Sequence, residues 1–335
     1  MDKAAFQKLF QENTKDPQWC PGCGDFTELN VLIRALAELA SEDREIHKNV
    51  NDFEEMGISG LEAKICKSCP EKHFYPRYEP HTVVTESGIG CAGQMFAYIN
   101  TYGAKATHGR ALPFSLGLKL ARPDLTVIPQ GGDGDAWAIG AGHFANFAGF
   151  NLDITYLVTN NEVYGLTKGQ MSPTSPVWLK TGVNPTGPIR EPMNPIAVAV
   201  SSGWTFVARL VNVGKLTNGF NTAEFSVDIL KKAIKHPGSS LVIFETECPT
   251  YNKVKTKEWL KERTVPISDV EPNYNPALAI DALKLSLVPE EEKIPIGIYY
   301  QVRRSTLHEK LGIEKPLINL KPDREKIKKL LERYS

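Results

Sequence analysis

The hydrophobic pattern of the chain alternates between short apolar runs and longer stretches in which apolar residues recur every three or four positions. The short runs predict β-strands, and the longer stretches predict helices. Strands are expected at residues 82–85, 125–130, 152–159, 205–211 and 240–246. This alternation predicts an α/β protein with a doubly wound, mostly parallel sheet. Its ligands should lie beyond the carboxyl ends of the strands.

The pattern weakens in two places, and these divide the chain. Residues from about 41 to 80 are charged and interrupted by Gly and Pro, which predicts an insertion or lid that contains Cys66 and Cys69. From about Lys253 the alternation fades, so the strand at 240–246 is expected to be the last of the core. The expected parts are an N-terminal extension over 1–18, a main domain over 19–252 and a C-terminal tail over 253–335 that ends in a surface helix.

Composition narrows the class of protein without identifying it. The chain has 335 residues, 41% of them hydrophobic, and 39 basic residues balance 39 acidic ones. The length suits one large domain or two, and the zero net charge gives no support to nucleic acid as a partner. The N-terminus lacks the apolar centre of a signal peptide, and no apolar run is long enough for a membrane span. We therefore expect a cytoplasmic protein with no membrane partner.

Two predicted strands end in residues that suit a diphosphate and a cation. The run 125–130 is followed by Gly132-Asp-Gly-Asp135, where backbone N–H groups at a helix start would face a phosphate. The run 152–159 ends at Asn160-Asn161. Neighbouring parallel strands would bring an Asp, an Asn oxygen and a carbonyl together, a set that fits Mg²⁺. The pair of motifs resembles that of thiamine-diphosphate enzymes, and an empty glycine-rich turn is the alternative.

Six cysteines in a chain expected to be cytoplasmic indicate metal or redox chemistry rather than disulfides. Four thiolates bind either Zn²⁺ or an iron–sulfur cluster, and spacing alone does not separate the two. The competing sets are Cys20, Cys23, Cys66 and Cys69, or Cys20, Cys23, Cys91 and Cys248. Position favours the second set, because its two single cysteines each follow a predicted strand at the edge where the diphosphate is expected. Cys66 and Cys69 stay unassigned.

Several short motifs occur together and in one order. They are Trp19-Cys-Pro-Gly-Cys-Gly24, Ser87-Gly-Ile-Gly-Cys91, His108-Gly-Arg110, Gly132-Asp-Gly-Asp135, Asn161-Glu-Val-Tyr-Gly-Leu-Thr-Lys-Gly-Gln170 and Cys248-Pro-Thr-Tyr-Asn252. Each is weak alone, but the combination resembles the β subunit of 2-oxoacid:ferredoxin oxidoreductases. The resemblance implies a thiamine-diphosphate-binding fold and CoA-dependent oxidative decarboxylation of a 2-oxoacid, or its reversal. Electrons would pass singly through a [4Fe–4S] cluster to ferredoxin.

The resemblance also implies the residues of the site. The cluster ligands would be Cys20, Cys23, Cys91 and Cys248, and Mg²⁺ would be held by Asp133, Asn161 and the carbonyl of Val163. The residues expected to contact thiamine diphosphate are Ile89, Gly90, Cys91, Ala92, His108, Gly134, Asp135, Gly165 and Leu166. His108 is also expected to take part in catalysis. The glutamate that activates the aminopyrimidine would come from an α (or αγ) partner in an α₂β₂-like assembly, so the chain alone should be inactive.

Lys168 carries the expectation for the substrate. It follows the predicted Mg²⁺ loop, and a cation there would suit a dicarboxylate such as 2-oxoglutarate, because leaving a buried charge unpaired is costly. The run Leu166-Thr-Lys-Gly-Gln170 also resembles the 2-oxoglutarate members. If Lys168 is only a solvated loop residue, pyruvate or a range of 2-oxoacids is the alternative. The rival functions are a cluster-free thiamine decarboxylase with zinc on its cysteines and a zinc-binding scaffold.

Overall fold

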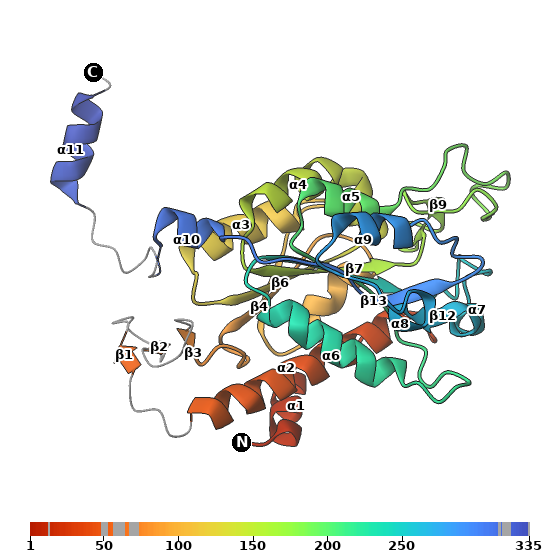
Figure 1. Cartoon of the computed structure of the whole chain (residues 1–335), viewed down its shortest axis with the longest axis horizontal. Helices are drawn as coiled ribbons and strands as arrows, with labels where there is room; N and C mark the ends of the chain where they lie inside the picture. The colour runs from red at the N-terminus through yellow and green to blue at the C-terminus, as the bar shows by residue number, and fades with distance from the viewer. Residues whose placement is uncertain are drawn as a thin grey trace.

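The computed structural model of the chain describes residues 1–12, 14–47, 53–55, 64–66, 74–313, 316 and 323–333. Its centre is an eight-stranded sheet in the order β12-β13-β10-β11-β7-β6-β4-β5 (Figure 1). These strands are β12 (Thr264–Pro266), β13 (Ile294–Gln301), β10 (Phe206–Val211), β11 (Ser239–Glu245), β7 (Ile154–Asn160), β6 (Thr126–Gly132), β4 (Val83–Ser87) and β5 (Tyr102–Lys105). All neighbours are parallel except β10 and β13. The predicted doubly wound, mostly parallel fold is confirmed.

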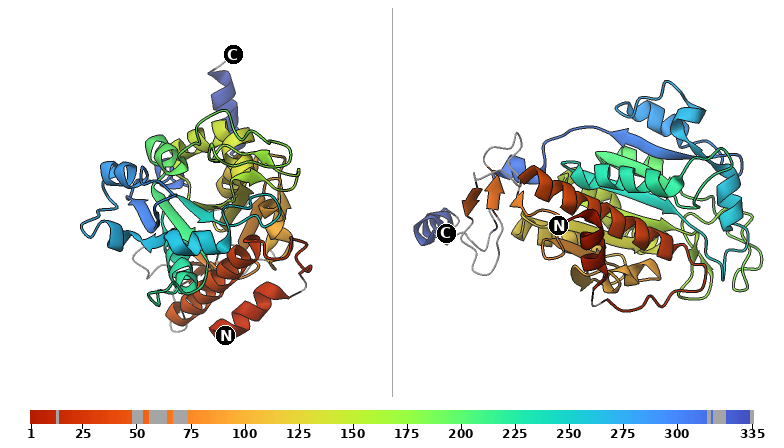
Figure 2. Two further views of the ribbon diagram at one scale, coloured as in Figure 1. Left: turned by 90° about the vertical axis from the view of Figure 1, so that its right-hand side faces the viewer. Right: turned by 90° about the horizontal axis from the view of Figure 1, so that it is seen from below.

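Helices cover both faces of the sheet, as Figures 1 and 2 show. One face carries α1 (Lys3–Gln11), α2 (Asp25–His47) and α6 (Thr222–Lys235), and the other carries α3 (Ala111–Ala121), α4 (Ala141–Phe147), α5 (Pro195–Ser202) and α9 (Ala279–Leu285). Successive strand residues point to opposite faces. On β7, Leu157 therefore packs under α2 and α6, whereas Tyr156 and Val158 pack under the second set of helices.

The tail contributes to the sheet, so the prediction that 240–246 is the last core strand was wrong. β13 pairs antiparallel with β10, with Phe206 opposite Gln301, and β12 pairs parallel with β13. Pro295 and Gly297 interrupt the apolar run of β13 in sequence, and both residues normally argue against a strand. The strand forms because its pairing with β10 and β12 and the burial of Ile294 and Ile296 outweigh that local preference.

The stretch expected to be an insertion begins later than predicted, because α2 continues to His47. Beyond it, β1 (Phe53–Glu55), β2 (Lys64–Cys66) and β3 (Phe74–Tyr75) form a separate antiparallel sheet. Cys66 ends β2, and Cys69 lies outside the described residues. At the other end of the chain, α11 (Arg324–Glu332) stands apart from the rest of the molecule in Figure 1.

The remaining elements are short and mostly border the carboxyl edge of the sheet or the tail. The segment after Cys91 forms the 3₁₀ turn η1 (Ala92–Ala97), and the π-helical turn η2 (Asp135–Ile139) lies just before α4. Others are η3 (Ala148–Phe150), the hairpin of β8 (Val163–Tyr164) and β9 (Gln170–Met171), α7 (Lys257–Arg263), α8 (Ile267–Val270) and α10 (Leu307–Leu311). None of the described helices has the length and hydrophobicity that crossing a membrane requires.

Candidate active site

The carboxyl ends of β4, β6, β7 and β11 lie side by side and form one edge of the sheet. Gly132 pairs with Thr159 in register, so the loop that starts at Gly132 lies beside Asn161. A cavity of about 80 Å³ opens at this edge. Its lining contains every residue predicted to contact thiamine diphosphate or Mg²⁺, together with Gly132, Tyr164 and Thr167. Residues separated by more than seventy positions in sequence are thus brought around one space.

Asp133 is a buried carboxylate suited to a bound cation. It is 3% exposed, and its Oδ1 accepts a hydrogen bond from the backbone N–H of Gly134 at 2.8 Å. Burial raises the pKa of Asp133 to about 6, and within the described part of the chain no lysine or arginine forms an ion pair with it. A cation bound between Asp133 and Asn161 would offset the cost of burying this charge. Mg²⁺ with oxygen ligands fits the residues present.

Asp135 does more than border the cavity. Its Oδ1 accepts hydrogen bonds from Ile89 N at 2.9 Å, from Gly109 N at 2.8 Å and from His108, whose Nδ1 lies 2.7 Å away. The carboxylate packs directly on Gly88, where an added Cβ would collide with Asp135 Oδ2. Asp135 therefore ties the loop after β4 and the imidazole of His108 to the Gly132–Asp135 loop. Sequence reasoning treated it only as a contact and missed this positioning role.

The cysteines of the favoured set lie around the same edge. An added Cβ on Gly165 would be 3.6 Å from Sγ of both Cys91 and Cys248, so the two sulfurs face one point. The Cys20–Cys23 loop joins them, because Trp19 Nε1 donates to Cys91 O at 2.8 Å. The other side of the Cys20–Cys23 loop packs against the residue that follows β11. An added Cβ on Gly24 would lie only 2.5 Å from Thr246 Cβ, so the loop is held close to Cys248.

All four of these thiols are free, and their exposure falls from Cys20 at the surface to buried Cys248. Burial raises the pKa of Cys23 far above its usual value and that of Cys91 to about 12. They would become thiolates only beside a cation, as in a metal or cluster site. The side chain of Cys66 and all of Cys69 lie outside the described part of the structure. The alternative ligand set that contains them, together with Cys20 and Cys23, therefore stays a prediction.

Lys168 is exposed and is not part of the cavity wall. It is exposed with φ of +78°, and its backbone N–H donates to Gly165 O at 3.1 Å in the β8–β9 turn. The neighbours Leu166 and Thr167 line the cavity, but Lys168 does not. Its side chain makes no ion pair with any residue that the structure describes. An ammonium group thus follows directly in sequence on two residues of the cavity wall.

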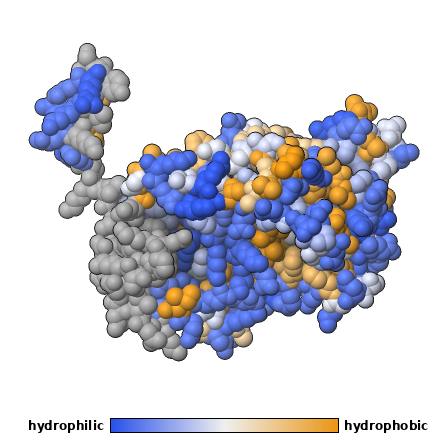
Figure 3. All heavy atoms as spheres, viewed as in Figure 1, coloured by the Kyte–Doolittle hydropathy of each residue, from blue (hydrophilic) through white to orange (hydrophobic). Residues whose placement is uncertain are grey.

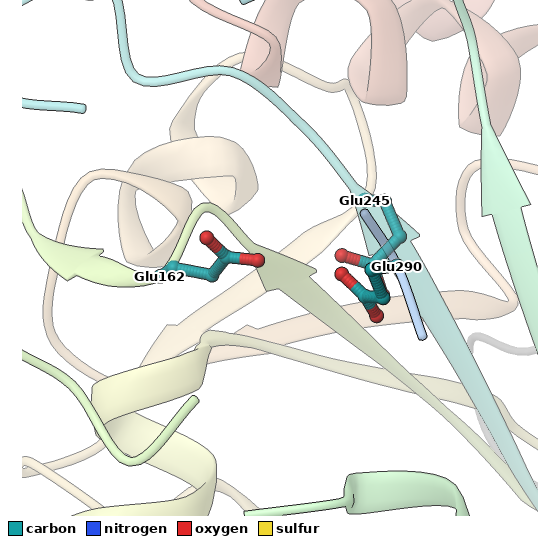
Figure 4. A group of neighbouring side chains, drawn as sticks. All are labelled: Glu162, Glu245 and Glu290. Atoms are coloured by element: carbon teal, nitrogen blue, oxygen red, sulfur yellow. The ribbon is translucent and has the colours of Figure 1, made fainter. Parts of the chain in front are cut away.

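Behind the Asn160–Asn161 segment lies a cluster of three carboxylates, from Glu162, Glu245 and Glu290 (Figure 4). One oxygen from each lies within 4.8 Å of the others, which would suit a metal ion. The chain supplies the cation itself, because Lys255 Nζ is 2.7 Å from Glu162, 2.6 Å from Glu245 and 4.0 Å from Glu290. The cluster borders a second cavity of about 290 Å³. Nothing in the sequence pattern indicated this arrangement.

Two family descriptions match the chain in adjoining segments. "Thiamine pyrophosphate enzyme, C-terminal TPP binding domain" matches residues 69–244. The C-terminal region of the beta subunit of pyruvate ferredoxin oxidoreductase matches residues 248–315. Together they cover the cavity, the cysteines that follow β4 and β11, and the strands of the tail.

Individual relatives agree with these matches. The chain is 35% identical over 303 residues to 2-oxoacid:ferredoxin oxidoreductase 2, subunit beta, of Aeropyrum pernix, covering 88% of this chain and 83% of that protein. It is 34% identical to the 2-oxoglutarate oxidoreductase subunit KorB of Mycobacterium tuberculosis, covering 77% and 58%. The solved 2-oxoglutarate:ferredoxin oxidoreductase from Magnetococcus marinus, with 2-oxoglutarate, coenzyme A and succinyl-CoA bound, aligns with a TM-score of 0.75 at 30% identity over 98% and 96% of the chains.

Proposed function

Because this chain belongs to the β subunits of the 2-oxoacid:ferredoxin oxidoreductases, we propose that its complex catalyses CoA-dependent oxidative decarboxylation of 2-oxoglutarate to succinyl-CoA, or the reverse carboxylation. The observation that carries the proposal is the single cavity that gathers Asp133, Asn161 and the loop after β4, with Cys91 and Cys248 beside it. As an oxidoreductase subunit the chain is part of an enzyme, so the alternative of a non-catalytic scaffold was wrong.

Thiamine diphosphate would lie in this cavity and supply the stabilised carbanion that decarboxylation requires. The start of η2 would present the backbone N–H of Asp135 to its diphosphate. Asp133, Asn161 and the carbonyl of Val163 would hold Mg²⁺. Asp135 would keep His108 and the loop after β4 in place around the cofactor.

A [4Fe–4S] cluster would be held by Cys20, Cys23, Cys91 and Cys248. The exposure of Cys20 supports a cluster close to the surface, where ferredoxin could approach. Free thiols and such a cluster suit a reducing compartment, so we also propose a cytoplasmic location. Residues 19–252 would carry both sites, and coenzyme A would accept the acyl group.

The α partner would complete the site. No glutamate is found among the described residues that line the cavity, so the group that activates the aminopyrimidine would come from another chain. Exposed apolar side chains lie near this edge, with Leu166 and Ile139 each 52% exposed. Figure 3 shows hydrophobic side chains gathered over the region of α9 and β13 as well. Exposed apolar patches of this kind mark interfaces with other chains, which supports an α₂β₂-like assembly.

The metal content of the complex, purified anaerobically, tests the proposal. We expect about four irons and about four sulfides per β subunit, and an EPR signal of the reduced cluster after dithionite. Thiamine diphosphate should be released on denaturation. Zinc without iron would refute the electron-transfer role and would favour the set of ligands that includes Cys66 and Cys69.

Replacing Lys168 with alanine should weaken the preference for 2-oxoglutarate over pyruvate. Lys168 would pair with the distal carboxylate, which pyruvate lacks, so only the larger substrate loses an interaction. We expect the ratio of the two kcat/KM values to fall about tenfold, equivalent to about 1.4 kcal/mol. Lys180→Ala, which removes another exposed lysine of the same loop region, should leave the ratio unchanged. An unchanged ratio in Lys168→Ala would leave pyruvate or broad specificity as the better description.

A further inference from the structure

We infer that Lys255 is a positioning residue that holds the Asn161–Val163 turn in the shape required to bind the diphosphate-bound cation. The inference rests on the proposed function and extends it to a residue that touches neither cofactor nor substrate. Lys255 is fully buried at 0% exposed, so it is not available to a reactant. Its effect must pass through the side chains that it contacts.

The turn that it supports has an unusual backbone. Glu162 has φ of +63°, in the left-handed region that residues other than Gly and Asn seldom adopt. This conformation allows Asn161 Oδ1 to accept from Val163 N at 3.1 Å, and both residues line the cavity. Ser175 Oγ donates to Glu162 O at 2.5 Å and fixes the peptide that follows. A glutamate keeps this left-handed backbone conformation only when its contacts compensate for the strain.

Lys255 supplies those contacts. Its ammonium donates to Glu162 Oε1 at 2.7 Å and to Glu245 Oε2 at 2.6 Å. Glu245 in turn accepts from Asn160 Nδ2 at 2.8 Å. The ammonium therefore joins the residues immediately before and after Asn161. Charge-assisted hydrogen bonds between buried groups are the strong ones, and their geometry is correspondingly fixed.

The segment that contains Lys255 also connects the Asn161–Val163 turn to Cys248. Asn252 Nδ2 donates to Asn161 O at 3.2 Å, and Asn252 Oδ1 accepts from Lys255 N at 3.0 Å. The backbone N–H of Asn252 donates to Cys248 O at 3.0 Å. One short stretch, 248–255, thus carries a proposed cluster ligand and also clamps the proposed Mg²⁺ turn.

Removing the ammonium should release the turn. Without Lys255, the carboxylates of Glu162 and Glu245 would be buried side by side with no cation between them. Repulsion and desolvation would make one carboxyl take up a proton or turn toward water. In either case Glu162 loses the charge-assisted bond that holds its backbone in the left-handed region. Arg209 does not substitute for the lysine, because its Nη1 is committed to Glu290 at 2.8 Å. Asn161 and Val163 would lose their shared orientation.

The test is the Mg²⁺ dependence of thiamine-diphosphate binding, measured by isothermal titration calorimetry on the full complex with its α partner. In Lys255→Met we expect the Mg²⁺ concentration for half-saturation to rise about 10- to 100-fold, as for other residues that orient metal ligands. Iron content should stay that of the wild type. Lys255→Arg, which keeps the positive charge, should retain most of the Mg²⁺ affinity.

Lys119→Met is the matched control. Lys119 is also a buried lysine, 3% exposed, but it donates to Pro123 O and Leu125 O before β6 begins, roughly 20 Å from the site by strand length. It should lose stability without losing Mg²⁺ affinity. Wild-type affinity in Lys255→Met, or an equal loss in Lys119→Met, would overturn the inference.

A second variant covers the case in which Lys255→Met does not fold. The double variant Glu245→Gln with Lys255→Met removes one charge of each sign, so it buries no additional net charge. Glu162 still loses its bond to the ammonium, and the same loss of Mg²⁺ affinity is expected. Normal Mg²⁺ affinity in this double variant would overturn the inference. If the wild-type complex bound no thiamine diphosphate, both the proposed function and this inference would be refuted. That result is distinguishable from a failure of the inference alone, in which the wild type binds the cofactor and the variants bind Mg²⁺ as well as the wild type does.

Discussion

Alanine in place of Asp133 is expected to abolish thiamine-diphosphate binding by the assembled enzyme. Asp133 is the only carboxylate among the proposed Mg²⁺ ligands, and it is 3% exposed. Without it, the cation would be held by neutral oxygens alone, and the charges of the diphosphate would be poorly neutralised. We expect the affinity to fall at least about 100-fold, equivalent to about 2.7 kcal/mol. Calorimetric titration with thiamine diphosphate in excess Mg²⁺ measures this directly.

Asp124→Ala provides a matched control for that experiment. Asp124 is also buried, at 5% exposed, but it pairs with Arg122 just before β6 begins, at the opposite end of the strand from Asp133. Its removal should lower the melting temperature and leave cofactor affinity as it was. If Asp133→Ala bound thiamine diphosphate within a few-fold of the wild type, Asp133 would not be a cation ligand.

Serine in place of Cys248 is expected to cost the complex its cluster and its ability to reduce ferredoxin. Cys248 is buried, and its sulfur faces the same point as that of Cys91. A serine hydroxyl is a poor ligand for iron where a thiolate is required. Ferredoxin reduction should drop below about 1% of the wild-type rate, and iron content should fall with it. Because Cys248 itself does not line the cavity proposed for thiamine diphosphate, binding of that cofactor should persist.

The double substitution Cys66→Ser with Cys69→Ser separates the two sets of cysteines. If Cys20, Cys23, Cys91 and Cys248 hold the cluster, this variant should keep its iron and its EPR signal. Loss of iron in the double variant together with full iron in Cys248→Ser would reverse the assignment and favour the site built from two Cys-x-x-Cys loops.

The strands and the polar residues at their ends could be read from the sequence because both depend on local pattern. β4, β6, β7, β10 and β11 each follow from a short apolar run, since burial on both faces of a parallel sheet requires one. Parallel strands then place their carboxyl ends at one edge. That rule brings Asp133 beside Asn161 without any knowledge of side-chain geometry.

Tertiary contacts decided the features that no local pattern encodes. β13 joins the sheet despite Pro295 and Gly297, because pairing with β10 outweighs local preference. Asp135 gains its role only from the loops that fold back onto it.

The setting of Lys255 was beyond the sequence for the same reason. Its carboxylate partners come from three separate parts of the chain, at Glu162, Glu245 and Glu290, and their spacing follows no periodicity. In sequence, a lysine in a charged stretch is expected to be solvated. Its burial depends on where the distant carboxylates lie, and only the folded chain brings them together.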